Sequence, residues 1–218
     1  MSDLLKKIMS TAKKAELGHG IHSKCVITKV EAGGRKNKEG QLVGRNCFTT
    51  FGQMNDKGEV VSEKEISWFD LDVTSEYVKE NFSEQILQLV NIMECFFEPS
   101  DIDTVFNEVF DEAGICDDTT LESVLADKAS LKKLMAQIAA NYAANMDGEL
   151  NNTDKPLRLK LSFDNKGKYV QQPRYGLIVE LDSVPSDESR LKFSNSEIES
   201  EIKSRNLIST TTKAPINI

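Results

Sequence analysis

The spacing of apolar residues changes twice along this chain, and that change limits the folds open to it. In residues 18–73 apolar and polar residues alternate, as in GIHSKCVITKVEA and RNCFTTFGQMN, which is typical of strands that bury one face. In residues 74–154 apolar residues recur every three or four positions, which indicates amphipathic helices. Alternation returns in LRLKLSF at 157–163. The chain is therefore expected to be an α+β protein with three strands, a block of helices and two further strands.

This order of elements predicts a particular barrel. A five-stranded Greek-key barrel of the OB type carries its helical element between the third and fourth strands. We therefore predict a five-stranded antiparallel OB-like barrel formed by residues 18–73 and 155–193, with residues 74–154 as a large acidic helical insertion. Residues 1–17 are expected to form an amphipathic segment, and residues 194–218 a mobile tail that includes one short helix.

Charged residues are distributed unevenly, although the net charge of the whole chain is -8. Residues 72–154 hold 18 acidic and 4 basic residues, a net charge of -14, whereas the rest of the chain holds 23 basic and 17 acidic residues, a net charge of +6. Binding responds to local fields, which reach about 8–10 Å at physiological ionic strength. The acidic helices are either a solvated face or a docking surface, and the basic remainder favours an anionic ligand.

Two loops concentrate the basic charge: GGRKNKEGQLVGR at 33–45 and DNKGKYVQQPRYG at 164–176. In an OB-type barrel the corresponding loops, with the face of strands 2 and 3, bind oligonucleotides. Single-stranded nucleic acid requires cations for its phosphates and aromatic rings on which its bases stack. The candidate nucleic-acid-binding residues, which are all basic or aromatic and lie in these loops or the adjoining strands, are Lys24, Arg35, Lys36, Lys38, Arg45, Phe48, Phe51, Trp68, Lys166, Lys168, Tyr169, Arg174 and Tyr175.

The aromatic residues of the expected second and third strands occur in pairs. Alternation places Phe48 and Phe51 on opposite faces of the sheet, and likewise the neighbours Trp68 and Phe69. One member of each pair is therefore expected in the core. We predict that Trp68 is a stacking ring and that Phe69 is a core residue.

The segment that runs from GIHSKCVITKVEAGGRKNKEG through RNCFTTFGQMN to ISWFDLD resembles the opening of OB-fold single-stranded-DNA-binding proteins encoded by tailed bacteriophages. The resemblance covers the order of elements over residues 18–184. It implies a protein that coats exposed strands, cooperatively or as a homo-oligomer, during DNA replication and recombination, with the basic loops and Trp68 as contacts. Unlike such proteins, which often end in an acidic tail, this chain ends in TTTKAPINI. The acidic helices of residues 74–154 are then expected to take over the role of such a tail, either by binding replication proteins or by keeping the basic groove from binding weakly to other ligands.

Catalytic and metal sites find little support in the sequence. The only two histidines, His19 and His22, and Cys25 follow each other in steps of three, which alternate faces on a strand instead of converging on a metal. The sequence contains neither GxxxxGKS nor GxGxxG. We therefore expect a protein that is not an enzyme and that binds no metal or cofactor.

The remaining expectations concern location and the alternative function. The longest apolar runs fall well short of the roughly 20 residues of a membrane-spanning helix, and the four cysteines form no CxxC pair. We therefore expect no membrane association and a cytoplasmic location, which would be the host cytoplasm if the chain is viral. The alternative function is that of a protein-interaction or viral structural module that works through its acidic helices. Trp68 would discriminate between the two functions: on an exposed groove its fluorescence should be quenched when DNA stacks on it, whereas in the core it should barely respond.

Overall fold

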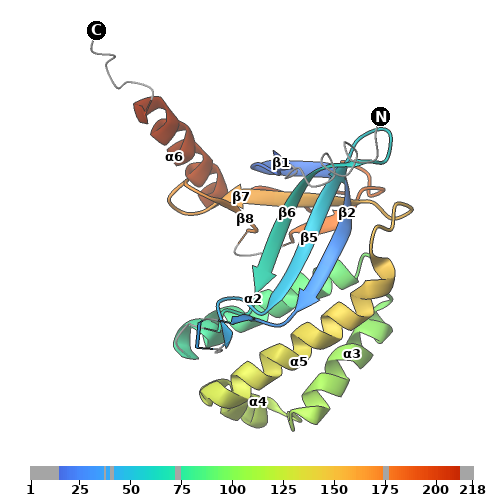
Figure 1. Ribbon diagram of the computed structural model, residues 1–218, viewed down its shortest axis with the longest axis vertical. Helices are drawn as coiled ribbons and strands as arrows, with labels where there is room; N and C mark the ends of the chain where they lie inside the picture. Colours follow the sequence, from blue (N-terminus) through green and yellow to red (C-terminus); the bar gives the residue numbers. More distant parts are fainter. Residues whose placement is uncertain (1–14, 37, 40–41, 72–74, 174–176, 212–218) are drawn as a thin grey trace.

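The computed structural model of the protein describes residues 15–36, 38–39, 42–71, 75–173 and 177–211. A curled sheet lies on a layer of helices, and one further helix extends from the far side of the sheet (Figure 1). The strands are β1 (Ala15–Glu16), β2 (Gly20–Ala32), β3 (Arg35–Lys36), β4 (Leu42–Val43), β5 (Cys47–Met54), β6 (Val60–Trp68), β7 (Leu157–Phe163), β8 (Val170–Gln171) and β9 (Val179–Leu181). The helices are α2 (Ser75–Met93), α3 (Pro99–Glu112), α4 (Asp118–Ala126), α5 (Lys128–Met146) and α6 (Asn195–Thr211), with a 3-10 turn at Asp147–Glu149.

The main sheet has the strand order β1-β6-β5-β2-β7-β8, and β9 also pairs with β7. Strands β3 and β4 form a separate hairpin. All pairs are antiparallel except β1 and β6, which are parallel. The chain is therefore α+β, with a mixed sheet.

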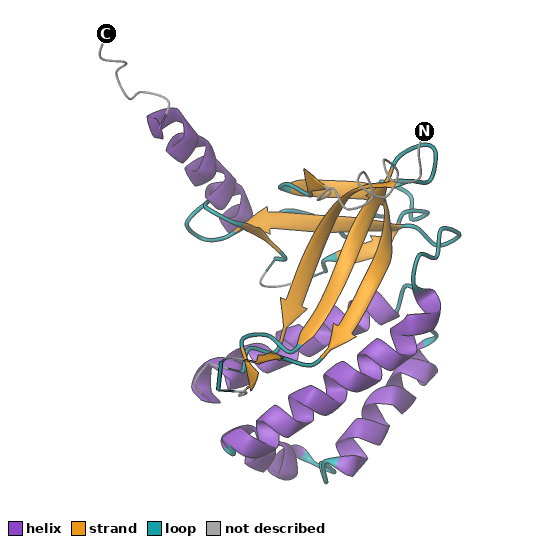
Figure 2. Cartoon of the chain, in the orientation of Figure 1, coloured by secondary structure: helices purple, strands orange, loops and turns teal. Residues whose placement is uncertain are grey.

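The predicted five-stranded antiparallel barrel is wrong. A closed barrel requires its third strand to pair with a strand from the end of the chain, but here β1 occupies the outer edge of β6, with Ala15 opposite Ser62 and Glu16 opposite Glu63. The strands that follow β7 are only two and three residues long and pair with β7. The sheet therefore remains an open, curled half-barrel (Figure 2).

Strand β2 is the strand that curls the sheet. Its first half, from Gly20 to Cys25, pairs with β7, and its second half, from Cys25 to Ala32, pairs with β5. The register shifts between His22 and Cys25, and Lys24 between them has a φ of 54°. A bulge of this kind bends a strand and increases its twist. As a result, β7 runs across the ends of β5 and β6 (Figure 1).

Helices α2 to α5 do lie between β6 and β7 in the chain, and they cover one face of the sheet. Helix α5 lies against β2 and β5, where the Tyr142 hydroxyl and Thr49 Oγ1 are 3.1 Å apart. Strand residues such as Phe51 and Leu159 share one buried cluster with helix residues such as Leu89. The helical block is thus part of the same core as the sheet. Among the described helices, none combines the length and the apolar character that spanning a membrane requires.

Helix α6 occupies most of the region that the sequence predicted to be a mobile tail. It packs on the turn between β7 and β8 through two small residues, Ser200 and Ser204, which are buried. Glycine at position 167 allows this close approach, because a Cβ atom there would lie only 2.6 Å from the Ser204 amide nitrogen. Its φ of 69° also favours glycine. The sequence indicated a short helix in this region, and the structure extends it to 17 residues.

Candidate nucleic-acid interface

Trp68, predicted to be a stacking ring, lies in the core with 0% of its surface exposed. Its indole Nε1 donates a hydrogen bond of 2.9 Å to Gln88 Oε1, and its ring meets that of Tyr142 at a centroid distance of 6.5 Å. A ring without exposed surface cannot stack on a base, so the prediction for Trp68 is wrong. The physical reason is the layer of helices, since Gln88 of α2 and Tyr142 of α5 cover the face on which Trp68 lies.

The prediction that Phe69 is a core residue is confirmed, since it is 1% exposed. Trp68 and Phe69 are neighbours, and both enter the core because Phe69 has a φ of 58°, which ends the alternation of the strand. The Phe69 amide nitrogen donates a hydrogen bond of 2.5 Å to Gln85 Oε1, and its ring lies 6.2 Å from that of Phe82. The side chains of α2 thus hold the end of β6 in this turned conformation.

Phe48 and Phe51 are also unsuited to stacking. Phe51 belongs to the main core cluster and is 0% exposed, and Phe48, which lies outside that cluster, is 9% exposed. Alternation was expected to leave one of these two candidate rings exposed for stacking, and this expectation is wrong because both are buried. Alternation correctly separated the two rings, but it did not reveal that both faces are covered at this point of β5.

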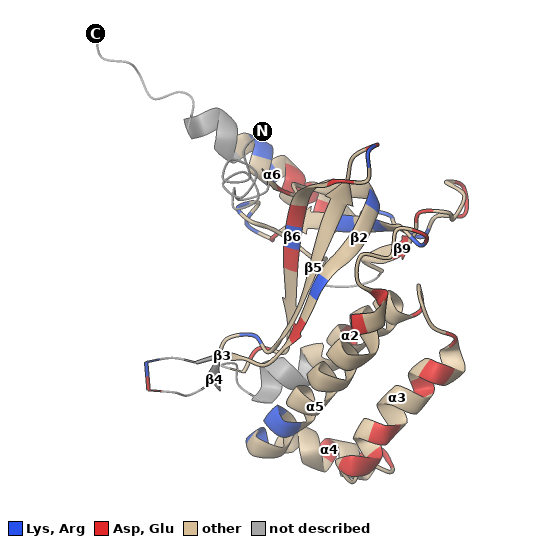
Figure 3. Ribbon diagram, turned by 45° about the vertical axis from the view of Figure 1, so that its right-hand side comes forward, with Lys and Arg blue, Asp and Glu red and all other residues tan. Residues whose placement is uncertain are grey.

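The groove on the β5–β6 face, on the side opposite the helices, is acidic. It has a volume of about 690 Å³, and its described lining includes Glu16, Glu63 and Glu65, with Lys29 as the one basic residue among the described ones. Lys29 Nζ is itself paired with Glu31 at 2.8 Å. Acidic residues run along β6 in Figure 3. Because like charges repel a phosphate backbone, this face is a poor surface for DNA, although the sequence predicted that DNA would bind over these two strands.

Lys24 lies apart from the two basic loops. It is exposed, and its Nζ donates a hydrogen bond of 2.6 Å to Asp56 Oδ1. This hydrogen bond and the charge of Asp56 raise the pKa of Lys24. Asp56 is in the turn that follows β5, whereas Arg45 precedes that strand. Lys24 and Arg45 are therefore at opposite ends of β5.

The first basic loop forms the β3–β4 hairpin, which extends beyond the ends of β5 and β6 (Figure 3). Arg35 pairs with Val43 and Lys36 with Leu42 through their backbones, but the side chains of Arg35 and Lys36 are outside the described part of the structure. Lys38 is exposed near the tip of the hairpin. Arg45 is nearer the sheet, and the structure places it in a cleft.

The second basic loop is the turn between β7 and β8. Asp164 Oδ1 accepts hydrogen bonds from the amide nitrogens of Lys168 and Tyr169, at 2.6 and 3.1 Å. At the tip, Lys168 Nζ lies 5.0 Å from the centre of the Tyr169 ring, which is 61% exposed. The turn therefore presents a cation and a free ring side by side. Arg174 and Tyr175 fall outside the described residues.

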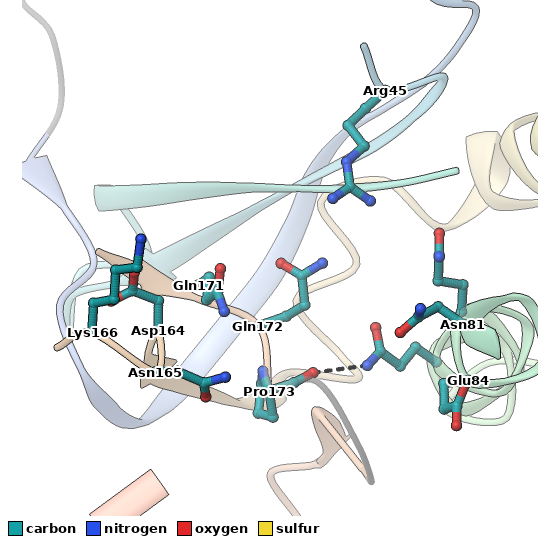
Figure 4. Close-up of a pocket in the computed structure, with 11 residues that line it drawn as sticks. Arg45, Asn81, Glu84, Asp164, Asn165, Lys166, Gln171, Gln172 and Pro173 are labelled. Atoms are coloured by element: carbon teal, nitrogen blue, oxygen red, sulfur yellow. Dashed lines mark hydrogen bonds between the residues drawn. The ribbon is translucent and has the colours of Figure 1, made fainter. Parts of the chain in front are cut away.

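Arg45 and Lys166, one from each basic loop, line the same cleft, which has a volume of about 320 Å³ (Figure 4). One wall comes from the turn and strand that follow β7, and the other from the middle of α2. The cleft is lined by Arg45, Asn81, Glu84, Gln85, Gln88, Asp164, Asn165, Lys166, Gln171, Gln172 and Pro173. We call it the amide cleft, because six of these eleven residues are asparagine or glutamine.

A chain of hydrogen bonds holds the walls of the amide cleft together. The Trp68 indole donates to Gln88 Oε1, and Gln88 Nε2 in turn donates to the carbonyl oxygen of Pro173 at 2.9 Å. Gln172 Nε2 donates to the carbonyl oxygen of Ser67 at 3.1 Å. These bonds join the end of β6, helix α2 and the segment after β8. The buried Trp68 therefore supports the cleft from behind instead of lining it.

Acidic groups in and near the amide cleft already have structural roles or lie away from solvent. Asp70 Oδ2 lies 3.6 Å from Arg45 Nε, with 34% of the Arg45 side chain exposed. Burial opposes the ionisation of Asp164, but hydrogen bonds from the amides of Tyr169 and Lys168 and the charge of Lys166 outweigh it and lower the pKa of Asp164. Glu84 Oε2 is buried and has no hydrogen-bond partner within the described structure. Among the described lining residues, Arg45 and Lys166 are the cations, and they share the cleft with Asp164 and Glu84.

Sequence reasoning missed the amides of α2. Asn81, Gln85 and Gln88 are spaced by four and three residues and so share one helix face, as does Glu84. Asn81 and Gln88 are buried, although this helix was interpreted only through its apolar stripe. A polar stripe at helical spacing beside an apolar one was the available signal.

The residues considered as metal ligands do not converge. The ring of His19 is stacked between those of Phe163 and Phe193, with centroid distances of 5.0 and 4.9 Å. His22 Nε2 lies 2.9 Å from the carbonyl oxygen of Gly18. Cys25 is buried, and burial raises its pKa to about 12. Within the described ranges no group of three or more His, Cys, Asp or Glu side chains is arranged to hold a metal ion.

Comparison with known proteins supplies no relative. No protein-family model, no curated protein and no solved structure matches this chain. The chemistry of the amide cleft and its surroundings is therefore the basis for a functional proposal.

Proposed function

We propose that this protein binds single-stranded DNA, without catalysis, through the amide cleft and the tip of the β7–β8 turn. The observation that carries the proposal is that Arg45 and Lys166, which come from distant basic loops, line one cleft. Two cations on one cleft suit the successive phosphates of a flexible strand better than they suit a single small anion.

The lining between these cations suits bases. Asparagine and glutamine amides both donate and accept hydrogen bonds, and they pair with the polar edges of bases. Because single strands leave these edges free, amides such as Asn165 and Gln171 can bind them without opening a duplex. Gln88 and Pro173 are already joined by a hydrogen bond, and a wall that is arranged before the ligand arrives loses less entropy on binding.

Because Trp68 is buried, it gives no support to DNA binding over the alternative function. The proposal depends instead on a ring at the tip of the β7–β8 turn. Tyr169 is largely exposed and lies under Lys168. A base stacked on such a ring contributes about 1–3 kcal/mol, and the lysine next to it can meet the adjoining phosphate. The contacts proposed for DNA are therefore Arg45, Lys166, Lys168 and Tyr169, together with the cleft amides.

A role in coating exposed strands during replication and recombination is part of the proposal, and so is assembly as a homo-oligomer. Both come from the resemblance to phage single-stranded-DNA-binding proteins. The acidic helices would bind replication proteins. Their charge supports a docking role, because residues 99–127 contain nine acidic residues and no basic one.

That acidic surface also favours a second candidate function, a module that binds a basic protein segment. All nine acidic side chains of residues 99–127 are exposed, and they gather on α3 and α4 in Figure 3. The two functions differ in which surface a ligand occupies. Only the first requires Arg45 and Lys166.

The test is fluorescence anisotropy of a labelled oligo-dT of roughly 20 nucleotides, longer than the roughly 4–16 nucleotides that single-strand-binding modules cover, titrated at several salt concentrations. We expect Arg45→Gln/Lys166→Gln to weaken binding and to lower the slope of log K against log salt by about 1.4, since each phosphate contact on a single strand contributes about 0.7. The matched control, Lys57→Gln/Lys133→Gln, removes two exposed charges outside the cleft. Absence of binding by the unmodified protein at low salt would exclude this function.

A further inference from the structure

A second cleft lies on the other side of the β7–β8 hairpin, between the hairpin and the start of α6. Its volume is about 610 Å³, nearly twice that of the amide cleft. Its lining includes two exposed basic residues, Arg190 and Lys192, and two partly buried rings, Phe163 and Phe193. None of these four residues is among the candidate binding residues predicted from the sequence. We call this site the α6 cleft.

The two clefts are contiguous. Asn165 of the turn and Gln171 of β8 line both of them. Both residues are exposed, so the hairpin is a shared polar edge and not a closed wall. A ligand that leaves the amide cleft past Lys166 therefore meets these two amides and then enters the α6 cleft.

The α6 cleft is held in place by a buried lysine. Lys160, whose side chain is 5% exposed, donates a hydrogen bond of 2.8 Å from Nζ to the carbonyl oxygen of Lys192. Its Nζ also lies 3.4 Å from Glu197 Oε1 and 5.8 Å from the centre of the Phe193 ring. Lys160 thus fixes the backbone of Lys192 and offsets the negative charge of Glu197, which also lines the cleft.

Glu197 has a further role in the local structure, as part of the start of α6. Its Oε2 accepts a hydrogen bond of 2.6 Å from the Ser194 amide, and the Glu197 amide donates to Ser194 Oγ at 3.3 Å. This reciprocal pair is a capping box. Because Glu197 is committed to Lys160 and to the cap, the charge available to a ligand in the α6 cleft is that of Arg190 and Lys192.

The aromatic side of the α6 cleft is rigid. The His19 ring is stacked between Phe163 and Phe193, at 5.0 and 4.9 Å. This stack joins the segment before β2, the end of β7 and the segment before α6. It offers partly exposed ring surface next to two cations, which is the combination that single-stranded nucleic acid requires.

We propose that the α6 cleft continues the path of single-stranded DNA from the amide cleft across the β7–β8 hairpin, with Arg190 and Lys192 as phosphate contacts and Phe193 as a surface for a base. This inference rests on the proposed function of the amide cleft. A short strand fills the amide cleft alone, whereas a longer strand occupies both clefts. Affinity therefore increases with length until the α6 cleft is filled.

The test compares two lengths of labelled oligo-dT. Single-strand-binding modules cover roughly 4–16 nucleotides, so a strand of about 5 nucleotides lies near the lower limit and one of about 20 exceeds the upper limit. The variant is Arg190→Gln/Lys192→Gln. Because both side chains are exposed, its circular dichroism spectrum is expected to match that of the unmodified protein. We expect it to bind the short strand as the unmodified protein does. For the long strand we expect weaker binding and a salt slope lower by about 1.4.

Each outcome identifies which proposal fails. If the variant binds both lengths like the unmodified protein and like the control Lys57→Gln/Lys133→Gln, the α6 cleft is not on the path, and the amide cleft remains the site. Equal loss for both lengths would also overturn the continuation, because the two clefts would not be filled in sequence. If the unmodified protein binds neither strand at low salt, the proposed function itself is wrong.

Discussion

The β5–β6 face and the β7–β8 hairpin belong to one curled sheet, but they present opposite chemistry to solvent. The groove on the β5–β6 face is lined by Glu16, Glu63 and Glu65. The hairpin has Lys166, Lys168 and the exposed Tyr169 at its turn and separates two polar clefts. In this curled sheet, which helices cover on one side, the lysines and the exposed ring therefore lie at a strand connection, and the regular strands contribute side chains to the core.

Trp68 at the end of β6 and Tyr169 in the β7–β8 turn are expected to differ most in how their removal changes the stability of the protein. We predict that Trp68→Ala lowers the free energy of unfolding by about 3–5 kcal/mol, as is typical when a large buried aromatic ring is removed. The loss includes the hydrogen bond to Gln88. Tyr169→Ala, which removes a ring that is 61% exposed, is expected to stay within about 0.5 kcal/mol. Urea denaturation of both variants measures the difference, and equal effects would contradict the burial of Trp68.

For DNA binding, in contrast, the exposed ring of Tyr169 is expected to be the important one. We predict that Tyr169→Ala weakens oligo-dT binding roughly 5- to 150-fold, the equivalent of one stacked base at about 1–3 kcal/mol. The salt slope stays unchanged, because no charge is removed. Tyr169→Phe serves as the control, since it keeps the ring and should bind normally. A Tyr169→Ala variant with full affinity would show that the tip of the turn is not a contact.

The Asp164 turn cap predicts a pH dependence. Its pKa is lower in the folded protein than in the unfolded chain, so its stabilising contribution is fully present above the usual aspartate pKa of about 4. The contribution is lost as the pH falls through the lower folded value. We predict that Asp164→Asn lowers the thermal midpoint at neutral pH and that the gap from the unmodified protein closes in acid. A gap of constant size across pH would contradict this role of the carboxylate.

The smallest effect is expected on the acidic face. Glu63→Gln/Glu65→Gln should change the free energy of unfolding by less than about 0.5 kcal/mol, as is usual for surface positions. Oligo-dT affinity should stay within about twofold, because screening over roughly 8–10 Å weakens long-range repulsion. Anisotropy at about 0.15 M salt, where this screening length applies, checks this. A large gain in affinity would mean that DNA passes over β5 and β6 after all.

The order of strands and helices could be predicted because apolar spacing depends only on local burial. That the sheet stays open could not be predicted. It depends on two residues, Ala15 and Glu16, which carry no strand pattern of their own and pair in parallel with the outer edge of β6. Helix α6 was underestimated for a similar reason. It packs through Ser200 and Ser204 on Gly167, and small polar residues leave no apolar stripe.

The two basic loops predicted from the sequence led to the amide cleft, whereas the aromatic rings of the strands did not. Arg45 and Lys166 line one cleft, a convergence that loop composition suggested. Whether a strand tryptophan is buried depends on what covers its face, and here distant segments such as Gln88 of α2 cover Trp68. The amides of α2 were visible only as a polar stripe on a helix, which by itself is typical of a solvated surface.

Hydrogen–deuterium exchange of the unmodified protein, with and without oligo-dT, tests the central claim most directly because it reports all of these surfaces at once. We expect protection in peptides that cover residues 164–173, 81–88 and 44–46, with no change in residues 60–67 or 99–127. Protection confined to residues 60–67 would place DNA on the acidic sheet face and would contradict the account. Protection by a basic peptide over residues 99–127, with none by oligo-dT anywhere, would favour the protein-binding function instead.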